Sequence, residues 1–284
     1  MPQTPIYFSP HQVATHSFIS IQKLPAFIAG AGRPTLEPAP FTEADFKLAH
    51  AAGYVDAVLQ LKIANGFGTR SESINRALAY SNATLWAAAA HVLDHGGIAC
   101  SASQGFHHAS HDSNFGYCTF NGLVIAARKA LERVGTVLII DGDAHYGDGT
   151  DSCLEALGLS SRIINITRGK GIGDAQSELD QDGWFDYTQT LIRRHRPALV
   201  LYQAGADAWE GDPYHCGYLS VEQLGWRDAG IFAACLQHAV PVAWNLAGGY
   251  TDPMDMTVSI HLQTLAASDA ALSAHGRTGH GKAR

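Results

Sequence analysis

Two aspartates and a histidine alternate with small residues directly after a short apolar run, in the stretch TVLIIDGDAHYGDGT at 136–150. The run at 136–140 is rich in β-branched residues, which is typical of a strand buried on both faces. If the strand geometry continues, its period of two places Asp141, Asp143 and His145 on one side of the backbone. Because such a group is costly to desolvate, we expect a bound divalent cation.

The same stretch has a simpler interpretation, namely a polar turn between a strand and a helix. Aspartate is common at helix caps, and Gly147 and Gly149 permit tight turns. A cap needs only one acid, however, whereas this stretch supplies Asp148 as a third aspartate in addition to the histidine. The two glycines also indicate that the backbone passes close to another group. The pattern therefore favours a metal site over a cap.

The composition limits both the fold and the partners. A chain of 284 residues that is 46% hydrophobic and 16% charged can bury one large core, so we expect a single domain. The net charge of −7 disfavours nucleic acid as a partner and suits a neutral or cationic substrate. Five cysteines without a CxxC pair predict reduced thiols and a cytoplasmic protein. Neither a signal peptide nor a membrane span is indicated, and a homo-oligomer is left open.

Apolar periodicity predicts strands that alternate with helices along the chain. We expect strands at 6–8, 98–102, 136–140, 162–166, 198–203 and 241–246. Helices are expected at 42–59, 82–95, 123–134, 151–157, 185–194 and 220–238, with a last one from Asp252 that has Pro253 as its first residue. The segment 25–40 reads as loop, and 275–284 reads as a frayed tail after a domain at 1–274. This alternation predicts a single-domain α/β fold, with a mostly parallel central sheet and helices on both faces.

Four of the predicted strands are followed by loops that carry reactive side chains. In a parallel sheet, function lies at the carboxyl ends of the strands. His107 and His108 follow the strand at 98–102, and Asp207 follows the one at 198–203. Tyr250 follows the strand at 241–246. These side chains and the 141–148 cluster are therefore expected at one edge of the sheet.

The motifs and their order resemble the zinc-dependent histone deacetylase and acetylpolyamine amidohydrolase family of the arginase/deacetylase superfamily. The matching segments are SQGFHHA at 103–109, FGYCTFN at 115–121, IIDGDAHYGDGT at 139–150, QAGAD at 203–207 and AGGY at 247–250. The resemblance runs from about residue 44 to the end, and five separated motifs in the family's order make it specific. It implies an arginase/deacetylase-like fold.

The resemblance implies that one metal ion is held by Asp143, His145 and Asp207. Two carboxylates and an imidazole suit Zn²⁺, with Fe²⁺ as the alternative. A two-manganese ureohydrolase on the same fold would need further carboxylates, but glycine occupies the corresponding positions 147 and 205. We therefore expect a site for a single metal ion.

The resemblance also implies roles for the remaining side chains. His108 would be the general base and then the general acid, oriented by Asp148. His107, paired with Asp141, would stay largely cationic, and Tyr250 would donate a hydrogen bond to the developing oxyanion. A binding protein without turnover is the competing interpretation, but it would usually have lost Tyr250 or a histidine. The implied reaction is removal of an acetyl or other short acyl group from a primary amine, as in an acetyl-lysine peptide or an acetylpolyamine.

The substrate channel and a monovalent cation site are further implications of the resemblance. The channel would be lined by Phe106, Gly116, Tyr117 and Tyr214. A K⁺ ion would be bound by Asp141 and by backbone carbonyls near Asn165 and Ile166. Three departures from the family bear on the substrate: Tyr146 in place of a second histidine, a shorter loop after Thr167, and no HPExPxR segment at 12–30. The loop NGFGTRS at 65–71 fits a functional loop and a plain connector equally.

Overall fold

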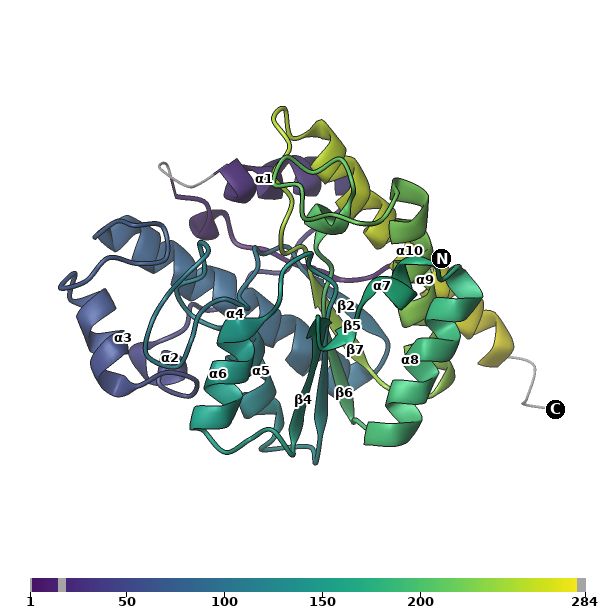
Figure 1. Cartoon of the computed structure of the whole chain (residues 1–284), viewed down its shortest axis with the longest axis horizontal. Coiled ribbons are helices and arrows are strands. Elements are labelled where there is room, and N and C mark those ends of the chain that lie inside the picture. Colours follow the sequence, from purple (N-terminus) through teal and green to yellow (C-terminus); the bar gives the residue numbers. More distant parts are fainter. Residues whose placement is uncertain (1, 15–18, 280–284) are drawn as a thin grey trace.

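Seven parallel strands form the centre of the molecule in the computed structural model, which describes residues 2–14 and 19–279 (Figure 1). Their order across the sheet is β1-β2-β7-β6-β3-β4-β5, and every pair of neighbouring strands is parallel. The strands are β1 Ile6–Tyr7, β2 Ile98–Ser101, β3 Val137–Asp141, β4 Ile163–Arg168, β5 Gly171–Ile172, β6 Leu199–Gln203 and β7 Val242–Asn245. The predicted α/β fold with a parallel sheet is confirmed.

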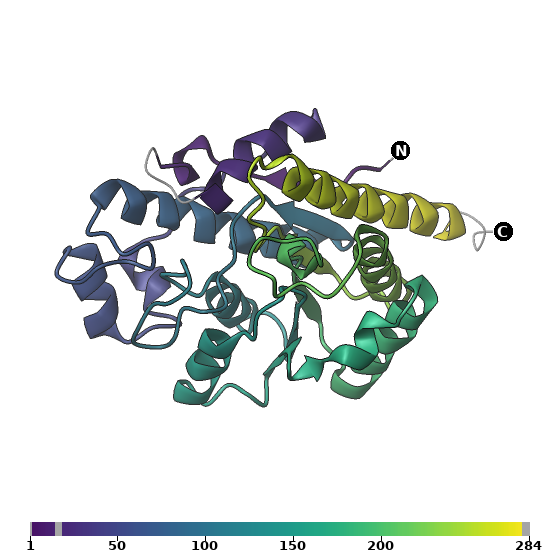
Figure 2. The same ribbon diagram turned by 45° about the horizontal axis from the view of Figure 1, so that its top comes forward.

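Helices cover both faces of the sheet (Figures 1 and 2). They are α1 Ile19–Ala31, α2 Glu43–Phe46, α3 Ala52–Leu59, α4 Glu72–His95, α5 Gly122–Ala130, α6 Asp148–Ala156, α7 Asp174–Ser177, α8 Gln181–His195, α9 Val221–Gln237 and α10 Asp255–Gly279. Alternate residues of β3 enter different cores: Ile139 belongs to the core that includes residues of α3, α4 and α5, whereas Leu138 belongs to the one that includes residues of α1, α8 and α9. Because both faces are buried, the strand sequence is apolar throughout.

The register of the sheet brings the carboxyl ends of its central strands to one level. Asp141 at the end of β3 lies opposite Gln203 of β6, and Gln203 lies opposite Asn245 of β7. Asn245 in turn lies opposite Ser101 of β2. The four loops that follow these strands therefore start side by side, as the sequence predicts.

The loop predicted at 25–40 is wrong for its first part, because α1 continues through Pro25 to Ala31. Proline removes one helical hydrogen bond and disturbs the preceding turn. The helix nevertheless buries Ile21, Leu24 and Phe27 at 5% exposure or less, and it packs beside α10 (Figure 2). Burying three large apolar side chains contributes several kcal/mol, roughly 1.5–3 each, which outweighs the effect of the proline.

Three other predicted helix boundaries are wrong. Helix α4 begins at Glu72, ten residues before 82, where the Ser71 hydroxyl accepts a hydrogen bond from the amide of Ile74. The helix predicted at 42–59 is broken between α2 and α3. The last helix begins at Asp255 and not at residue 252, so Pro253 is not its first residue.

The predicted tail from residue 275 is helical at its start, and the loop at 65–71 is held by side-chain hydrogen bonds. Helix α10 runs to Gly279, beyond the predicted start of the tail at 275, and 280–284 lie outside the described residues. The loop is held by the Asn65 side chain, which accepts from the amides of Phe67 and Thr69.

Within the described part of the chain, no helix has both the length and the apolar character needed to cross a membrane.

The break between α2 and α3 anchors the loop that follows the paired histidines. The amide of Ala51 donates to the carbonyl of His111 at 2.8 Å. The ring of His50 bonds the carbonyl of Ser110 through Nδ1 and accepts from the amide of Asn121 through Nε2, both at 2.8 Å. Burial lowers the pKa of His50 to about 4, so the ring stays neutral and can make both bonds.

Candidate active site

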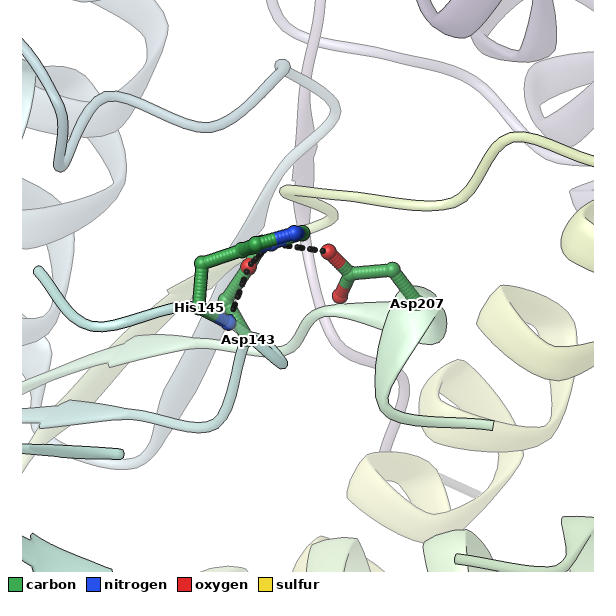
Figure 3. Close-up of side chains that lie close together, drawn as sticks. All are labelled: Asp143, His145 and Asp207. Carbon is green, nitrogen blue, oxygen red and sulfur yellow. Dashed lines mark hydrogen bonds and ion pairs between the residues drawn. The ribbon is translucent and has the colours of Figure 1, made fainter. Parts of the chain in front are cut away.

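Asp143, His145 and Asp207 converge at the carboxyl edge of the sheet (Figure 3). The first two follow β3, and the third lies in the short 3₁₀ turn Ala206–Ala208 after β6. One ligand atom from each lies within 4.8 Å of the others. Nδ1 of His145 is 3.0 Å from Oδ1 of Asp143 and 3.1 Å from Oδ2 of Asp207. The three residues predicted as metal ligands are thus brought together.

The electrostatics of this cluster favour a cation between the carboxylates. The carboxylates of Asp143 and then Asp207 accept from the ring of His145 and raise the pKa of His145 to about 11. Burial and the charge of Asp143 raise the pKa of Asp207 to about 7. Apart from this contact with His145, the buried Oδ2 atom of Asp207 has no hydrogen-bond partner among the described residues. A dication would balance the two carboxylates and use this oxygen, so the donor set fits a divalent metal.

Two glycines let the backbone approach these side chains closely. A Cβ on Gly248 would lie 2.2 Å from Oδ2 of Asp207 and 2.6 Å from Oδ2 of Asp143. A Cβ on Gly149 would lie 2.4 Å from the carbonyl carbon of His108. All three distances are far below van der Waals contact, so a side chain at either position would displace the cluster or the histidine pair.

Arg227 of α9 holds the backbone of the two loops that carry the cluster, and its sequence context did not indicate this role. Its guanidinium donates to the carbonyl of Gly142 at 2.8 Å and to the carbonyl of Gly205 at 3.3 Å. Those carbonyls belong to the loops that carry Asp143 and Asp207. Arg227 and its partner Asp228 are both at most 1% exposed, with Nε 2.9 Å from the carboxylate. The buried pair therefore ties both metal-ligand loops to α9.

Replacing Arg227 by methionine is expected to lower the free energy of unfolding by about 3–5 kcal/mol, because it leaves Asp228 as a buried charge without its counterion. Urea denaturation followed by circular dichroism measures this change. The matched variant Arg193→Met lies on the exposed side of α8 and should change stability by no more than about 0.5 kcal/mol. Equal effects of the two substitutions would contradict the supporting role of Arg227.

Two histidine–aspartate pairs lie beside the cluster. Nδ1 of His107 is 2.7 Å from Oδ2 of Asp141, and Nδ1 of His108 is 2.6 Å from Oδ1 of Asp148. The two rings lie 4.1 Å apart between centroids. Because an ionised carboxylate can only accept, each Nδ1 carries the proton, and Nε2 of a neutral ring keeps its lone pair.

The two histidines differ in their charge. Although burial disfavours the cation, the charges of Asp141 and Asp143 raise the pKa of His107 to about 9. Burial and the positive charge of His107 lower the pKa of His108 below its ordinary value. At neutral pH the buried ring is therefore cationic and its neighbour neutral, which is the arrangement of a fixed positive charge beside a base.

Asp141 is fully engaged by other protein groups. Gln203 and the amide of Asp143 donate to Oδ1, while Thr167 and His107 donate to Oδ2. The contributions of Gln203 and Thr167 were missed, since neither residue type signals chemistry in a sequence. The carboxylate is thereby held so that it orients His107.

The other two residues of the predicted K⁺ site lie on β4. Asn165 and Ile166 pair with Ile139 and Ile140 of β3 in the sheet. The side-chain amide of Asn165 donates to Asp151 at 3.1 Å, which directs it towards α6. Asp141, Asn165 and Ile166 are thus on adjacent strands, and K⁺ binding there stays a prediction.

Tyr250 and its neighbours line a narrow pocket above the cluster. The wall includes Gln104, Gly105, His107, His108, Gly116, Tyr117, Cys118, Asp143, Ala247, Gly248 and Tyr250. The rings of Tyr250 and Tyr214 lie 4.4 Å apart, and the Tyr214 hydroxyl is 3.5 Å from that of Tyr117. The carboxylate of Asp212 accepts from the Tyr250 amide at 2.9 Å and so positions its loop. The predicted channel residues Gly116, Tyr117 and Tyr214 lie at or beside this pocket.

Phe106 does not line the pocket, contrary to the sequence-based expectation. Its side chain is 1% exposed and packs in the core below the loop, against Gly122 at the start of α5. His107 and His108 take the pocket side of the same segment.

Another residue that the sequence did not indicate is Lys23 of α1, which is fully buried and donates from Nζ to the carbonyl of Ala247.

The fold and the site together define a parallel α/β domain with a candidate mononuclear metal centre beside paired histidines. Its sequence matches the family model of the histone deacetylase domain over residues 11–167 and 160–265. The chain therefore belongs to the histone deacetylase family. The family resemblance read from the five motifs is confirmed.

Three similar proteins were compared with the chain, and two of them are named histone deacetylases. An uncharacterised protein of Picosynechococcus sp. is 30% identical over 226 residues, which cover 73% of each chain. Histone deacetylase 2 of Oryza sativa subsp. japonica is 28% identical over 85% of this chain and 54% of its own length. Histone deacetylase 8 of Xenopus laevis is 26% identical over 62% of this chain and 61% of its own. The match thus spans between about half and two thirds of these two named deacetylases.

Proposed function

We propose that the protein is a metal-dependent amidohydrolase that removes an acetyl or other short acyl group from a primary amine. The observation that carries the proposal is the convergence of the Asp143, His145 and Asp207 cluster with two histidine–aspartate pairs and Tyr250 around one pocket. Membership of the histone deacetylase family supports the same chemistry. The substrate would be an acetyl-lysine peptide or an acetylpolyamine.

A bound Zn²⁺ or Fe²⁺ would polarise the amide carbonyl and lower the pKa of a water molecule beside it. Nε2 of His108 takes a proton from the attacking water and later delivers it to the leaving amine nitrogen. Asp148 holds the ring in the tautomer that leaves Nε2 available. His107 keeps its proton and places a fixed positive charge next to the reacting centre.

Tyr250 acts as the hydrogen-bond donor to the amide oxygen as it gains negative charge. Burial and the charges of Asp207 and Asp143 raise the pKa of its phenol well above the ordinary value. The hydroxyl therefore keeps its proton at neutral pH and remains a donor. The ring of Tyr214, packed against it, limits the orientations that Tyr250 can adopt.

The mouth of the pocket suits a flexible aliphatic amine. Phe115 is 67% exposed and lies 5.6 Å from the ring of His108, while Tyr214 is 44% exposed beside Tyr250. Exposed aromatic rings can pack along methylene groups and attract an ammonium group. The net charge of −7 also favours a cationic substrate.

A panel of substrates tests the proposal directly. Acetyl-lysine peptides, acetylpolyamines and longer acyl-lysines are incubated with the zinc-loaded protein, and the released amine is measured. We expect turnover of at least one acetylated amine, and we expect Tyr250→Phe to lower kcat by ~10²-fold or more while metal remains bound. The control is Tyr187→Phe, which removes a hydroxyl bonded to the Gly171 carbonyl, away from the pocket.

Two results would contradict the proposal in different ways. No turnover of any acylated amine, together with binding of the same compounds, would favour a binding protein. Normal turnover by Tyr250→Phe would leave the reaction in place and overturn the role of that tyrosine. Metal content is measured in each variant, so that a loss of ion is distinguished from a loss of the hydroxyl.

A further inference from the structure

A second pocket lies at the opposite edge of the sheet from the proposed catalytic centre. Its volume is about 500 Å³, and the ends of α4 and α9, the start of β2 and part of α10 form its walls. Ile98 is the first residue of β2, and Val240 precedes β7 by two residues, so the pocket is at the amino ends of these strands. Its lining includes the histidines His91, His95 and His275.

His91 and His95 lie one turn apart at the end of α4. Residues four apart on a helix share a face, and the two ring centroids are 4.7 Å apart with their planes at 57°. Two imidazoles with this spacing on one helical face can chelate a zinc ion. The pair therefore has the spacing of a metal chelate and faces an open pocket.

The hydrogen bond made by His91 leaves its second nitrogen for coordination. The hydroxyl of Tyr7 on β1 is 3.2 Å from Nδ1 of His91. A metal-binding histidine usually bonds a neighbouring group through one nitrogen, which fixes the ring and directs the other nitrogen to the ion.

The surroundings of the pair also favour a positive charge. His95 is the last residue of α4, and Leu236 and Ala239 place the carboxyl end of α9 on the same pocket. Helix carboxyl ends carry a partial negative charge and stabilise cations.

We propose that His91 and His95 bind a divalent transition metal ion at the amino edge of the sheet, independently of the Asp143, His145 and Asp207 cluster. Imidazole nitrogens suit Zn²⁺, Ni²⁺ and Cu²⁺. The two histidines supply two ligands, and the pocket gives room for water in the remaining positions. The ion would link two successive turns at the end of α4, and the hydrogen bond to Tyr7 of β1 orients the ring of His91. Its role is structural and does not depend on the proposed deacetylation.

Calorimetric titration with Ni²⁺ tests the site. The untagged full chain is stripped of metal and titrated at pH 7.5, and the number of bound ions is checked by elemental analysis. Wild type is expected to bind one more equivalent than His95→Ala, whatever number the other cluster binds. Tyr7→Phe is expected to keep the additional equivalent but to weaken it by ~10-fold or more.

The matched control is His195→Ala. His195 also ends a helix, α8, but the residue four positions before it is Leu191, so it has no histidine partner on its face. This variant should keep the stoichiometry of wild type. Equal stoichiometry in wild type and His95→Ala, or the same loss in His195→Ala, would overturn the site. Because the side chain of His95 is exposed, its replacement should leave the fold intact, which circular dichroism verifies.

Discussion

Asp207→Ala is expected to release the proposed catalytic metal and to reduce turnover to the uncatalysed background. Asp207 provides one of two carboxylates in a cluster of three ligand residues, and its buried Oδ2 contacts only the ring of His145 among the described polar groups. Removing it leaves one carboxylate and one imidazole, a set that no longer balances a dication. The measurement is metal content after dialysis, combined with amine release.

The experiment is best carried out in a His95→Ala background, so that the proposed second site does not contribute to the metal count. Asp151→Asn is the matched control, since Asp151 is also a partly buried carboxylate, but it lies on α6 and is held by Lys170 and Tyr146. It should keep the ion and most of the turnover. Retention of a full equivalent by Asp207→Ala would show that Asp207 is not a ligand.

The convergence of these side chains was predictable because it follows from sheet geometry. The apolar run before Asp141 predicts a buried strand, and parallel strands end at one edge. Asp141 lies opposite Gln203, so the loops with Asp143 and Asp207 begin at adjacent positions. Local sequence and one general rule of topology were sufficient.

The supports of the site depend on contacts between residues distant in sequence, which local patterns do not reveal. Arg227 reaches the carbonyl of Gly142, 85 positions away, and its sequence context resembles that of any polar residue on a helix. Lys23 lies in a segment that Pro25 marks as loop, yet its buried ammonium bonds the carbonyl of Ala247, 224 positions away. The apolar residues around Pro25 would have signalled α1 only if their burial against α10 had been known.

The failure with Phe106 has a similar cause. In the motif SQGFHHA the segment is neither helix nor strand, so no period relates the direction of Phe106 to that of His107. The phenyl ring of Phe106 packs against Gly122, which has no side chain to obstruct it. Gly122 begins α5 and lies outside the motif, so the motif alone does not reveal this contact. Side-chain direction in an irregular loop is decided by such distant partners.

His108→Ala is expected to lower kcat by ~10²- to 10⁴-fold, the usual contribution of a general acid–base group. Burial and the charged His107 ring lower the pKa of His108 from its ordinary value, so the wild-type base is neutral at pH 7. A base with a lowered pKa stays deprotonated until the pH falls below that pKa. The acid limb of wild-type kcat/KM should therefore lie at a lower pH than the titration of an ordinary histidine, and it should disappear in the variant.

The matched control for this substitution is His111→Ala, three residues further along the same loop. Nδ1 of His111 bonds the carbonyl of Ala49 at 2.9 Å, and its ring is not among the groups that line the pocket. Its removal should leave both kcat and the acid limb near their wild-type values. If instead His108→Ala keeps the acid limb with only a small loss in kcat, the proton is carried by another group. His107 would then be the candidate, although its raised pKa makes it a poor base at neutral pH because it already holds a proton there.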